Sequence, residues 1–401
     1  MLSFVFIFFG CSNAASKNES APESSPCDST EEVIVGAQRT ELYLPLLKGK
    51  KVGLYSNHTG MVSADKHTLD VLKDNDIDVV CAFSPEHGFR GTADAGEKVS
   101  SSVDPATGVE IVSLYGSGKA EAMDKAMDNI DVVVVDIQDV GLRFYTYYCT
   151  MLELMNSAAA KGKEVVVLDR PNPNGMYIDG PILDMKYASG VGRLPIPVVH
   201  GLTLAEMAQM INGEGWLKDG RHVKLSVVPC DNYTHATRYE LPIAPSPNLR
   251  TMRAIYLYPS ICYFEATPVS LGRGTDKPFE IYGHPAMTGR KYSFTPESRP
   301  GAKEPPQKNV KCYGVDLSDL DNEEIISRGI NLEYLIDAYK DVTAHSADKK
   351  FFTSFFEKLI GKPDIRTMIE KGMSADEIKA TWTDDVEKFR LQRRPYLLYE
   401  E

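Results

Sequence analysis

Short runs rich in valine and isoleucine alternate with helix-like segments in the first half of the chain, and this alternation constrains the fold more than any other feature. The strand-like runs cover residues 51–55, 77–83, 131–136 and 164–168. Helical spacing and good helix formers occupy residues 68–75, 120–127 and 148–161. Strands that alternate with helices form βαβ units with parallel strands. The pattern therefore predicts an α/β fold with a mostly parallel sheet.

A polar loop follows each of the four strand-like runs. The loops read Ser-Asn-His-Thr-Gly from Ser56, Ser-Pro-Glu-His-Gly-Phe-Arg-Gly from Ser84, Gln-Asp-Val-Gly-Leu-Arg from Gln138 and Asp-Arg-Pro-Asn-Pro-Asn-Gly from Asp169. Open parallel sheets bind ligands outside the carboxyl ends of their strands. Ionisable groups held there are partly desolvated, which shifts their pKa values toward catalytic use. We therefore expect the four loops to line one crevice.

The length of the chain indicates two lobes. Single hydrophobic cores stop growing near ~250–300 residues, whereas this chain has 401. From about Pro242 the sequence becomes dense in proline, glycine and aromatics. A strand-rich stretch around residues 308–316 and helical patterns at residues 332–339, 351–360 and 376–392 follow. We expect a catalytic α/β lobe at residues 31–241 and a smaller α+β lobe at residues 242–401, with the active site in the cleft between them.

Residues 1–11 form a short apolar run that ends at Gly10 and Cys11. It is too short to span a bilayer, which takes roughly 20 residues. The pattern is typical of a bacterial lipoprotein signal peptide in which Cys11 is lipidated, with a disordered apolar terminus or another cleavage site as the alternative. Residues 12–30 carry few large apolar groups, so we expect a disordered tether. These features predict a periplasmic or cell-envelope protein that touches a bacterial membrane only through its lipid anchor.

Charge and motif content argue against several classes of partner. The net charge is −12 and no lysine- or arginine-rich block occurs, so nucleic acid is not an expected partner. Neither a Walker loop nor a dinucleotide fingerprint follows a strand-like run, so no nucleotide cofactor is expected. No histidine or cysteine pair has metal-ligand spacing, so we expect no metal and no other cofactor. Buried free thiols are favoured over a disulfide framework, because a chain of this size needs no covalent staples.

Glu86 is the expected general acid. It follows Pro85 and is flanked by Phe83 and Phe89, which can desolvate the carboxyl group and keep it protonated near neutral pH. A salt bridge to Arg90 is the alternative, and it would lower the pKa of Glu86. A metal site is a further alternative, and its ligands would be His58, Glu86, His87, Asp139 and Asp169.

Asp139 and Asp169 each lie beside an arginine in the sequence, which suits catalytic carboxylates that stay ionised. For Asp169 the alternative is a residue that fixes a turn. Arg143 and Arg273 lie in glycine-containing loops, where a fork-shaped guanidinium can bind a ligand carboxylate. For Arg143 the alternative is a salt bridge to Asp139. Tyr145 lies in an aromatic run that can stack on a sugar ring or belong to the core.

Seven ordered motifs resemble one known family. They are Asn-His-Thr-Gly from Asn57, Pro-Glu-His-Gly-Phe-Arg-Gly from Pro85, Asp-Ile-Gln-Asp-Val-Gly-Leu-Arg-Phe-Tyr-Thr-Tyr from Asp136, Asp-Arg-Pro-Asn-Pro from Asp169, Pro-Ser-Pro-Asn from Pro245, Gly-Arg-Gly-Thr from Gly272 and Arg-Pro-Tyr-Leu-Leu-Tyr from Arg394. Together they are similar to the NamZ-type exo-β-N-acetylmuramidases of glycoside hydrolase family 171. The resemblance extends from about residue 45 to the C-terminus. It implies a Rossmann-like lobe joined to a smaller lobe, and release of N-acetylmuramic acid (MurNAc) from the non-reducing ends of peptidoglycan fragments.

The same motifs, together with Phe-Glu-Ala-Thr from Phe264 in the segment dense in proline and aromatics, supply the expected substrate-binding residues. These are Asn57, His58, His87, Arg90, Arg143, Tyr145, Arg170, Asn172, Glu265 and Arg273. MurNAc carries a lactyl carboxylate, for which Arg143 is the first candidate and Arg273 the second. The acetamido group of MurNAc can itself attack the anomeric carbon, so the second carboxylate either orients that group or activates water. A non-catalytic muropeptide-binding lipoprotein and a metal-dependent cell-wall esterase or amidase are the competing functions.

Overall fold

The computed structural model describes residues 31–85, 89, 102–114, 116, 118–346 and 350–401, and residues from Val33 onward form one compact unit. Seven strands form one sheet in the order β3-β4-β2-β1-β5-β6-β7. Their bounds are β1 (Lys51–Ser56), β2 (Asp78–Ser84), β3 (Ser102–Val103), β4 (Glu110–Ser113), β5 (Val132–Asp136), β6 (Glu164–Leu168) and β7 (Lys224–Val228). Only the edge strand β3 runs antiparallel to its neighbour. The predicted parallel α/β sheet is confirmed.

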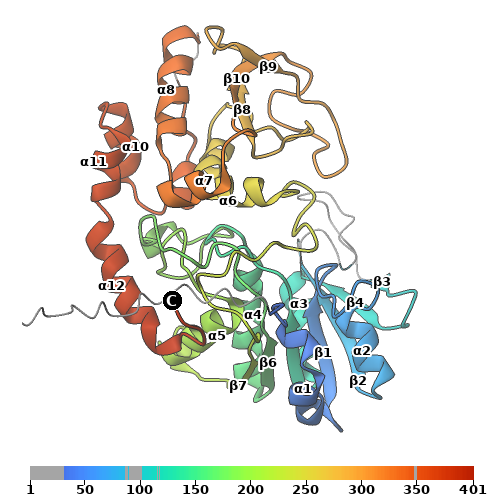
Figure 1. Ribbon diagram of the computed structural model, residues 1–401. Coiled ribbons are helices and arrows are strands. Elements are labelled where there is room, and N and C mark those ends of the chain that lie inside the picture. Colours follow the sequence, from blue (N-terminus) through green and yellow to red (C-terminus); the bar gives the residue numbers. More distant parts are fainter. Residues whose placement is uncertain (1–30, 86–88, 90–101, 115, 117, 347–349) are drawn as a thin grey trace, which may run out of the picture. The chain divides into compact units, whose positions relative to one another are not determined.

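Helices cover both faces of this sheet (Figure 1). The helices of this part are α1 (Thr40–Leu47), α2 (Thr68–Asp74), α3 (Lys119–Asp128), α4 (Tyr147–Lys161) and α5 (Leu204–Gly213). Alternate residues of the strands point to opposite faces, so β5 contributes Val132 and Val134 to the core under α1 and α2, and Val133 and Val135 to the core under α4 and α5. Burial on both faces explains why the central strands read as continuous apolar runs.

The C-terminal part has its own small sheet. Its three antiparallel strands, in the order β8-β10-β9, are β8 (Ile281–His284), β9 (Tyr292–Phe294) and β10 (Cys312–Asp316). Its helices are α6 (Met252–Ile261), α7 (Asn322–Arg328), α8 (Glu333–His345), α9 (Phe356–Ile360), α10 (Asp364–Glu370), α11 (Ala375–Ala380) and α12 (Thr383–Arg393). Figure 1 shows this small sheet with α8 set apart from the large sheet. A second α+β lobe is thus confirmed, while its boundary at residue 242 stays a prediction.

The C-terminal tail returns to the large sheet. Short 3₁₀ helices occur at Gly36–Gln38, Met185–Tyr187, Lys218–Gly220, Cys262–Ala266 and Arg394–Tyr396. At the end of the last of these, the Tyr396 carbonyl accepts a hydrogen bond from Gln209 of α5 at 3.1 Å. The Tyr399 hydroxyl reaches Asp169 beyond the end of β6 at 2.6 Å. The tail of the chain therefore packs against the first lobe, where Tyr396, Leu397 and Leu398 are partly buried against the core.

All five cysteines in the described part of the chain are buried free thiols, as expected: Cys81, Cys149, Cys230, Cys262 and Cys312. A capping box begins α5, because the Thr203 hydroxyl accepts from the Glu206 N–H and the Glu206 carboxylate accepts from the Thr203 N–H. No helix within the described ranges has the length and apolarity to cross a membrane.

Candidate active site

The carboxyl ends of β1 and β5 meet at the topological switch point of the large sheet. From β1 the chain builds outward through β2 and β4 and then returns to the other side of β1 with β5. Such a switch point is where open α/β sheets bind ligands. Ser56 of β1 lies opposite Asp136 of β5, so the loops that follow the two strands begin side by side. We call the end of the sheet formed by Ser56, Ser84, Asp136 and Leu168 the carboxyl edge. The four parallel strands end at this one edge, as expected, while the crevice expected between their loops stays a prediction.

Asp139 lies at this edge, in the loop that follows β5, with only 6% of its surface exposed. Its Oδ1 accepts a hydrogen bond from the Gly141 N–H at 2.7 Å, and its Oδ2 is buried with no hydrogen-bond partner among the described residues. Burial raises the pKa of Asp139 to about 7, although the backbone N–H groups of Gly141 and Val140 act to lower it. An unpaired carboxyl group of this kind is suited to proton transfer or to a polar ligand group.

The expectation that a neighbouring arginine keeps Asp139 ionised is wrong. Arg143 makes no bond to Asp139 and instead binds four backbone carbonyls. The carboxyl group therefore loses its water without gaining a counter-ion, and it titrates near neutral pH.

The loop after β1 contributes one buried and one partly exposed side chain. Asn57 is fully buried, where its Nδ2 donates to the Tyr147 hydroxyl at 2.9 Å and its Oδ1 accepts from Thr59. His58 is partly exposed, and its Nε2 lies 2.9 Å from the Ala244 carbonyl oxygen. Asn57 thus shapes the loop from within, and His58 is the side chain of this pair that remains accessible to a ligand.

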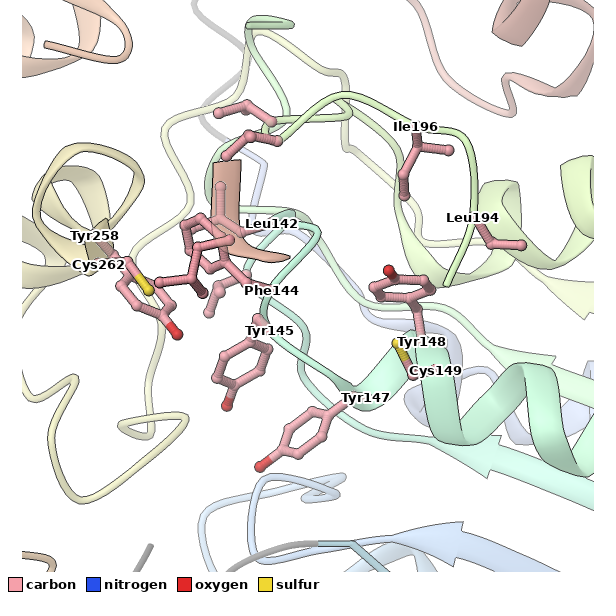
Figure 2. Close-up of a cluster of buried hydrophobic side chains, with 14 of the residues drawn as sticks. Leu142, Phe144, Tyr145, Tyr147, Tyr148, Cys149, Leu194, Ile196, Tyr258 and Cys262 are labelled. Atoms are coloured by element: carbon pink, nitrogen blue, oxygen red, sulfur yellow. The ribbon is translucent and has the colours of Figure 1, made fainter. Parts of the chain in front are cut away.

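Two tyrosines line the start of α4 beside this loop. The rings of Tyr145 and Tyr147 meet edge to face with centroids 4.7 Å apart, and both hydroxyls donate to the Pro245 carbonyl, at 2.9 Å and 3.4 Å. Figure 2 shows the two hydroxyls pointing the same way. Tyr145 also packs against Tyr258 and is buried, so it forms a wall of the site and offers no open stacking face. Tyr147 belongs to the same aromatic run as Tyr145, but the sequence did not predict it as a site residue.

Asp169 has a structural environment, contrary to the catalytic role expected from the sequence. Its Oδ1 accepts from the Ala205 N–H in the first turn of α5 at 3.0 Å, and its Oδ2 accepts from the Tyr399 hydroxyl at 2.6 Å. Burial raises its pKa to about 7 even though hydrogen bonds from Thr203 and Tyr399 lower it. Both oxygens are occupied and the side chain has no exposed surface, so Asp169 fixes the loop after β6.

Arg170 and Asn172, expected to bind substrate, are likewise buried and bonded within the protein. Arg170 forms a two-pronged ion pair with Asp136, at 2.6 Å and 3.1 Å, across the ends of β5 and β6. The side chain of Asn172 donates to the Leu202 carbonyl at 2.9 Å and accepts from the Asn174 N–H at 2.8 Å. The expectation of direct substrate contact is therefore corrected for both residues, because their polar groups already hold the carboxyl edge together.

Arg143 is fully buried and does not present its guanidinium to a ligand. Its Nη1 and Nη2 donate, at 2.7–2.9 Å, to the carbonyl oxygens of Pro181, Ile196, Leu359 and Ile360. Burial lowers its pKa to about 10, which still leaves it charged. The geometry contradicts the assignment of Arg143 to the lactyl carboxylate, and it equally excludes the alternative salt bridge to Asp139.

Arg273 is the expected arginine that keeps exposed surface and unused donors. Its Nη2 pairs with Glu265 Oε1 at 2.6 Å, and the two side chains are 22% and 28% exposed. Its guanidinium lies over the Phe279 ring at 5.0 Å, and within the described chain its other two nitrogens make no hydrogen bond. The pair adjoins Tyr258, which packs against Tyr145, so Glu265 and Arg273 belong to the same neighbourhood as the tyrosine wall.

Three expected site residues, Glu86, His87 and Arg90, lie outside the described residues, as does Cys11. Their roles stay predictions. Among the residues that the structure describes, no group of three or more histidine, cysteine, aspartate or glutamate side chains is arranged to hold a metal ion.

Comparison with known proteins settles the family. Two domains described as the N-terminal and C-terminal parts of exo-β-N-acetylmuramidase NamZ match residues 52–253 and 256–399. The chain belongs to the NamZ family. Peptidoglycan β-N-acetylmuramidase NamZ from Bacillus subtilis (strain 168) is 37% identical over 384 residues, which cover 89% of each chain.

Solved structures of two DUF1343 family proteins from Bacteroides fragilis NCTC 9343 share the fold of this NamZ family member. One is 57% identical, covers 92% of this chain and 100% of its own, and superimposes with a TM-score of 0.85. The other is 27% identical, with coverages of 92% and 99% and a TM-score of 0.78. The resemblance inferred from the seven motifs is thus confirmed over nearly the whole chain.

Proposed function

We propose that this protein is an exo-acting glycoside hydrolase that releases MurNAc from the non-reducing ends of peptidoglycan fragments. The observation that carries the proposal is the buried carboxyl group of Asp139 at the switch point, whose Oδ2 has no hydrogen-bond partner among the described residues, in a chain that is 37% identical to a peptidoglycan β-N-acetylmuramidase over 89% of its length. Glycoside hydrolysis requires carboxyl groups whose pKa values are set by their surroundings, and Asp139 has that property.

We assign the two carboxyl roles to Glu86 and Asp139. Glu86 protonates the leaving oxygen, as its place in the sequence suggests. Asp139 acts in its ionised form, because either orienting the acetamido nitrogen or activating a water molecule needs a carboxylate that accepts a hydrogen bond. Its free Oδ2 is the atom available for that contact.

The test is incubation of the purified protein with the disaccharide MurNAc-β-1,4-GlcNAc and with its reverse isomer, GlcNAc-MurNAc. An exo-muramidase releases free MurNAc from the first and leaves the second intact. Binding of the first without cleavage would favour the muropeptide-binding lipoprotein. Release of acetate or peptide from muropeptides, suppressed by a chelator, would favour the esterase or amidase.

Arg273→Ala is expected to erode the preference for MurNAc over GlcNAc glycosides. We assign the lactyl carboxylate to Arg273, since it keeps exposed surface and two nitrogens that make no hydrogen bond within the described chain. A charge-assisted bond contributes roughly 1.5–3 kcal/mol, so the ratio of kcat/KM values for the two glycosides should fall by about one to two decades.

The matched control for this change is Arg238→Ala. Arg238 also pairs with a glutamate, Glu323, at 2.8 Å, but its pair lies on the surface at the start of α7. Its loss should leave the ratio of kcat/KM values unchanged. If Arg273→Ala also leaves that ratio unchanged, whatever the loss in absolute rate, Arg273 does not bind the lactyl group.

We further propose that Cys11 is lipidated and anchors the protein to a bacterial envelope membrane, supported by the apolar run before it and the polar tether after it. Cys11→Ser should then shift the protein from the membrane fraction to a soluble or unprocessed form, as seen by fractionation and intact-mass analysis. A Cys11→Ser protein that stays membrane-bound and fully processed would contradict the anchor. Ser12→Ala serves as the control, since it leaves the thiol in place.

A further inference from the structure

Asp139, Val140 and Gly141 form the turn that carries the Asp139 side chain, and each of their backbone carbonyls accepts a hydrogen bond. The Gln138 side chain donates from Nε2 to the Asp139 carbonyl at 2.8 Å and to the Pro171 carbonyl at 2.7 Å. The Asn174 side chain donates from Nδ2 to the Val140 carbonyl at 2.9 Å. The Gly141 carbonyl accepts a longer bond from the His200 N–H at 3.4 Å. The turn is therefore fixed at three successive peptide groups.

Asn172 closes the remaining side of the turn. Gly141 has a φ of +77°, which glycine tolerates and other residues rarely adopt. A Cβ atom at this glycine would lie 2.2 Å from Asn172 Oδ1, so the amide packs directly against the Gly141 backbone. Asn172 also accepts from the Asn174 N–H, which holds the second amide in place. The loop after β6 thus supports the loop after β5.

We propose that Gln138, Asn172 and Asn174, here named the amide clamp, are positioning residues for Asp139, which fix its turn so that Oδ2 stays buried, unpaired and aimed at the substrate. This rests on the proposed function, in which Asp139 is the second carboxyl group. The proposal replaces the substrate-contact role expected for Asn172, whose polar atoms are all used within the protein.

Neutral amides suit this task for an electrostatic reason. Amide donors satisfy the turn's carbonyls without bringing a charge near the carboxyl group, whereas a lysine or arginine there would hold it ionised. The ionisable groups that couple to Asp139 are Tyr55 on β1, Tyr145 before α4 and Cys149 on α4. These three are neutral at pH 7, since tyrosine and cysteine ordinarily titrate above that pH and burial raises each pKa further. The clamp therefore leaves burial as the main influence on the pKa of Asp139.

The experiment removes one clamp donor at a time, in Gln138→Met and Asn174→Ala. Each should lower kcat on MurNAc-GlcNAc by about 10²-fold while KM changes little, because a small displacement of a reacting group is costly to catalysis and leaves substrate contacts in place. A loosened turn admits water, so the pKa of Asp139 should also fall toward the ordinary value for aspartate. Carbon-13 NMR of labelled aspartate, assigned by comparison with Asp139→Asn, measures that pKa without reference to activity.

Asn212→Ala is the matched control. Asn212 donates to the Val223 carbonyl at 3.1 Å and accepts from the Val223 N–H at 2.9 Å, an equivalent bridge between α5 and the residue before β7, away from Asp139. It should alter stability alone, with kcat and the Asp139 pKa unchanged.

The proposal is overturned if the folded clamp variants keep both the wild-type kcat and the wild-type pKa of Asp139. It is also overturned if neither clamp variant folds while the control does, since the amides would then hold the fold and not the carboxyl group. Release of MurNAc by the wild-type protein establishes the proposed function separately, so failure of the clamp is distinguished from failure of the function.

Discussion

Asp139→Asn is expected to lower kcat on MurNAc-GlcNAc by about 10²–10⁴-fold, the usual effect of removing a general acid or base. The change keeps the side-chain volume and the Oδ1 that accepts from Gly141. In the wild-type protein, kcat/KM should rise as the pH increases through about 7, because Asp139 works ionised and its pKa lies there. The variant should lack that rising limb. If kcat/KM of the variant still rises with pH through about 7, another group titrates there and has the catalytic role assigned to Asp139.

The same residue makes folding stability depend on pH. The folded pKa of Asp139 is about 7, whereas an exposed aspartate titrates near ~3.9. A carboxyl pKa raised by folding gives stability that is complete at low pH and is lost as the pH rises through the folded value. Because asparagine does not titrate, the variant should gain in Tm relative to the wild type between pH 5 and pH 8. Asp169, whose pKa burial also raises to about 7, is present in both proteins, so the comparison isolates Asp139. A Tm difference that is equal at the two pH values would contradict the raised pKa.

Much of the fold follows from the sequence, because periodicity is a local property. The strand-like run at residues 164–168 matches β6 in full, and the pattern at 148–161 differs from α4 by one residue. Prediction of secondary structure from the sequence failed where contacts between distant parts of the chain determine the helices. Helix α6 was not expected, since it contains Pro259 and lies in a stretch rich in proline and aromatics. The single helical pattern expected at 376–392 is interrupted at Trp382, whose indole N–H donates to Asp179 at 2.9 Å.

The sequence predicted where the site lies, but not which of its polar residues are free to bind a ligand and which are bonded within the protein. Parallel strands bring their following loops to one edge whatever the side chains are, so the edge could be inferred from strand order. Whether a polar side chain is free depends on partners far away in the sequence. The partners of Arg143 at Leu359 and Ile360 are 216 and 217 residues distant. In the sequence, Arg143 and Arg273 therefore look equivalent, as arginines in glycine-containing loops, although Arg143 is fully buried and the Arg273 side chain is 22% exposed.

Arg143→Met is expected to lower the free energy of unfolding by about 3–4 kcal/mol. The change leaves four buried carbonyls without their donor, and each unsatisfied buried group costs about 1–3 kcal/mol, a loss offset in part because the buried cation is removed too. Two of the carbonyls belong to the C-terminal end of α9, so the loss also frees the contact between this helix and the loop that contains Pro181. Urea unfolding measures the change. Arg143→Lys should recover only part of it, because an ammonium group cannot reach four acceptors in the geometry of the guanidinium fork.

Changes at the two arginines should therefore affect different properties, stability for Arg143 and substrate specificity for Arg273. Arg143→Met, assayed on its folded fraction, should keep the wild-type ratio of kcat/KM for MurNAc over GlcNAc glycosides, whereas Arg273→Ala should change that ratio and leave stability nearly unaltered. Arg250→Met controls for loss of an arginine as such, because Arg250 is exposed and makes a single bond to the Pro247 carbonyl at 2.8 Å. Surface changes of that kind usually stay within ~0.5 kcal/mol. If Arg143→Met is as stable as the wild type yet loses the preference for MurNAc, then the four carbonyl bonds are not the main role of Arg143. Arg143 would then be the residue that binds the lactyl group.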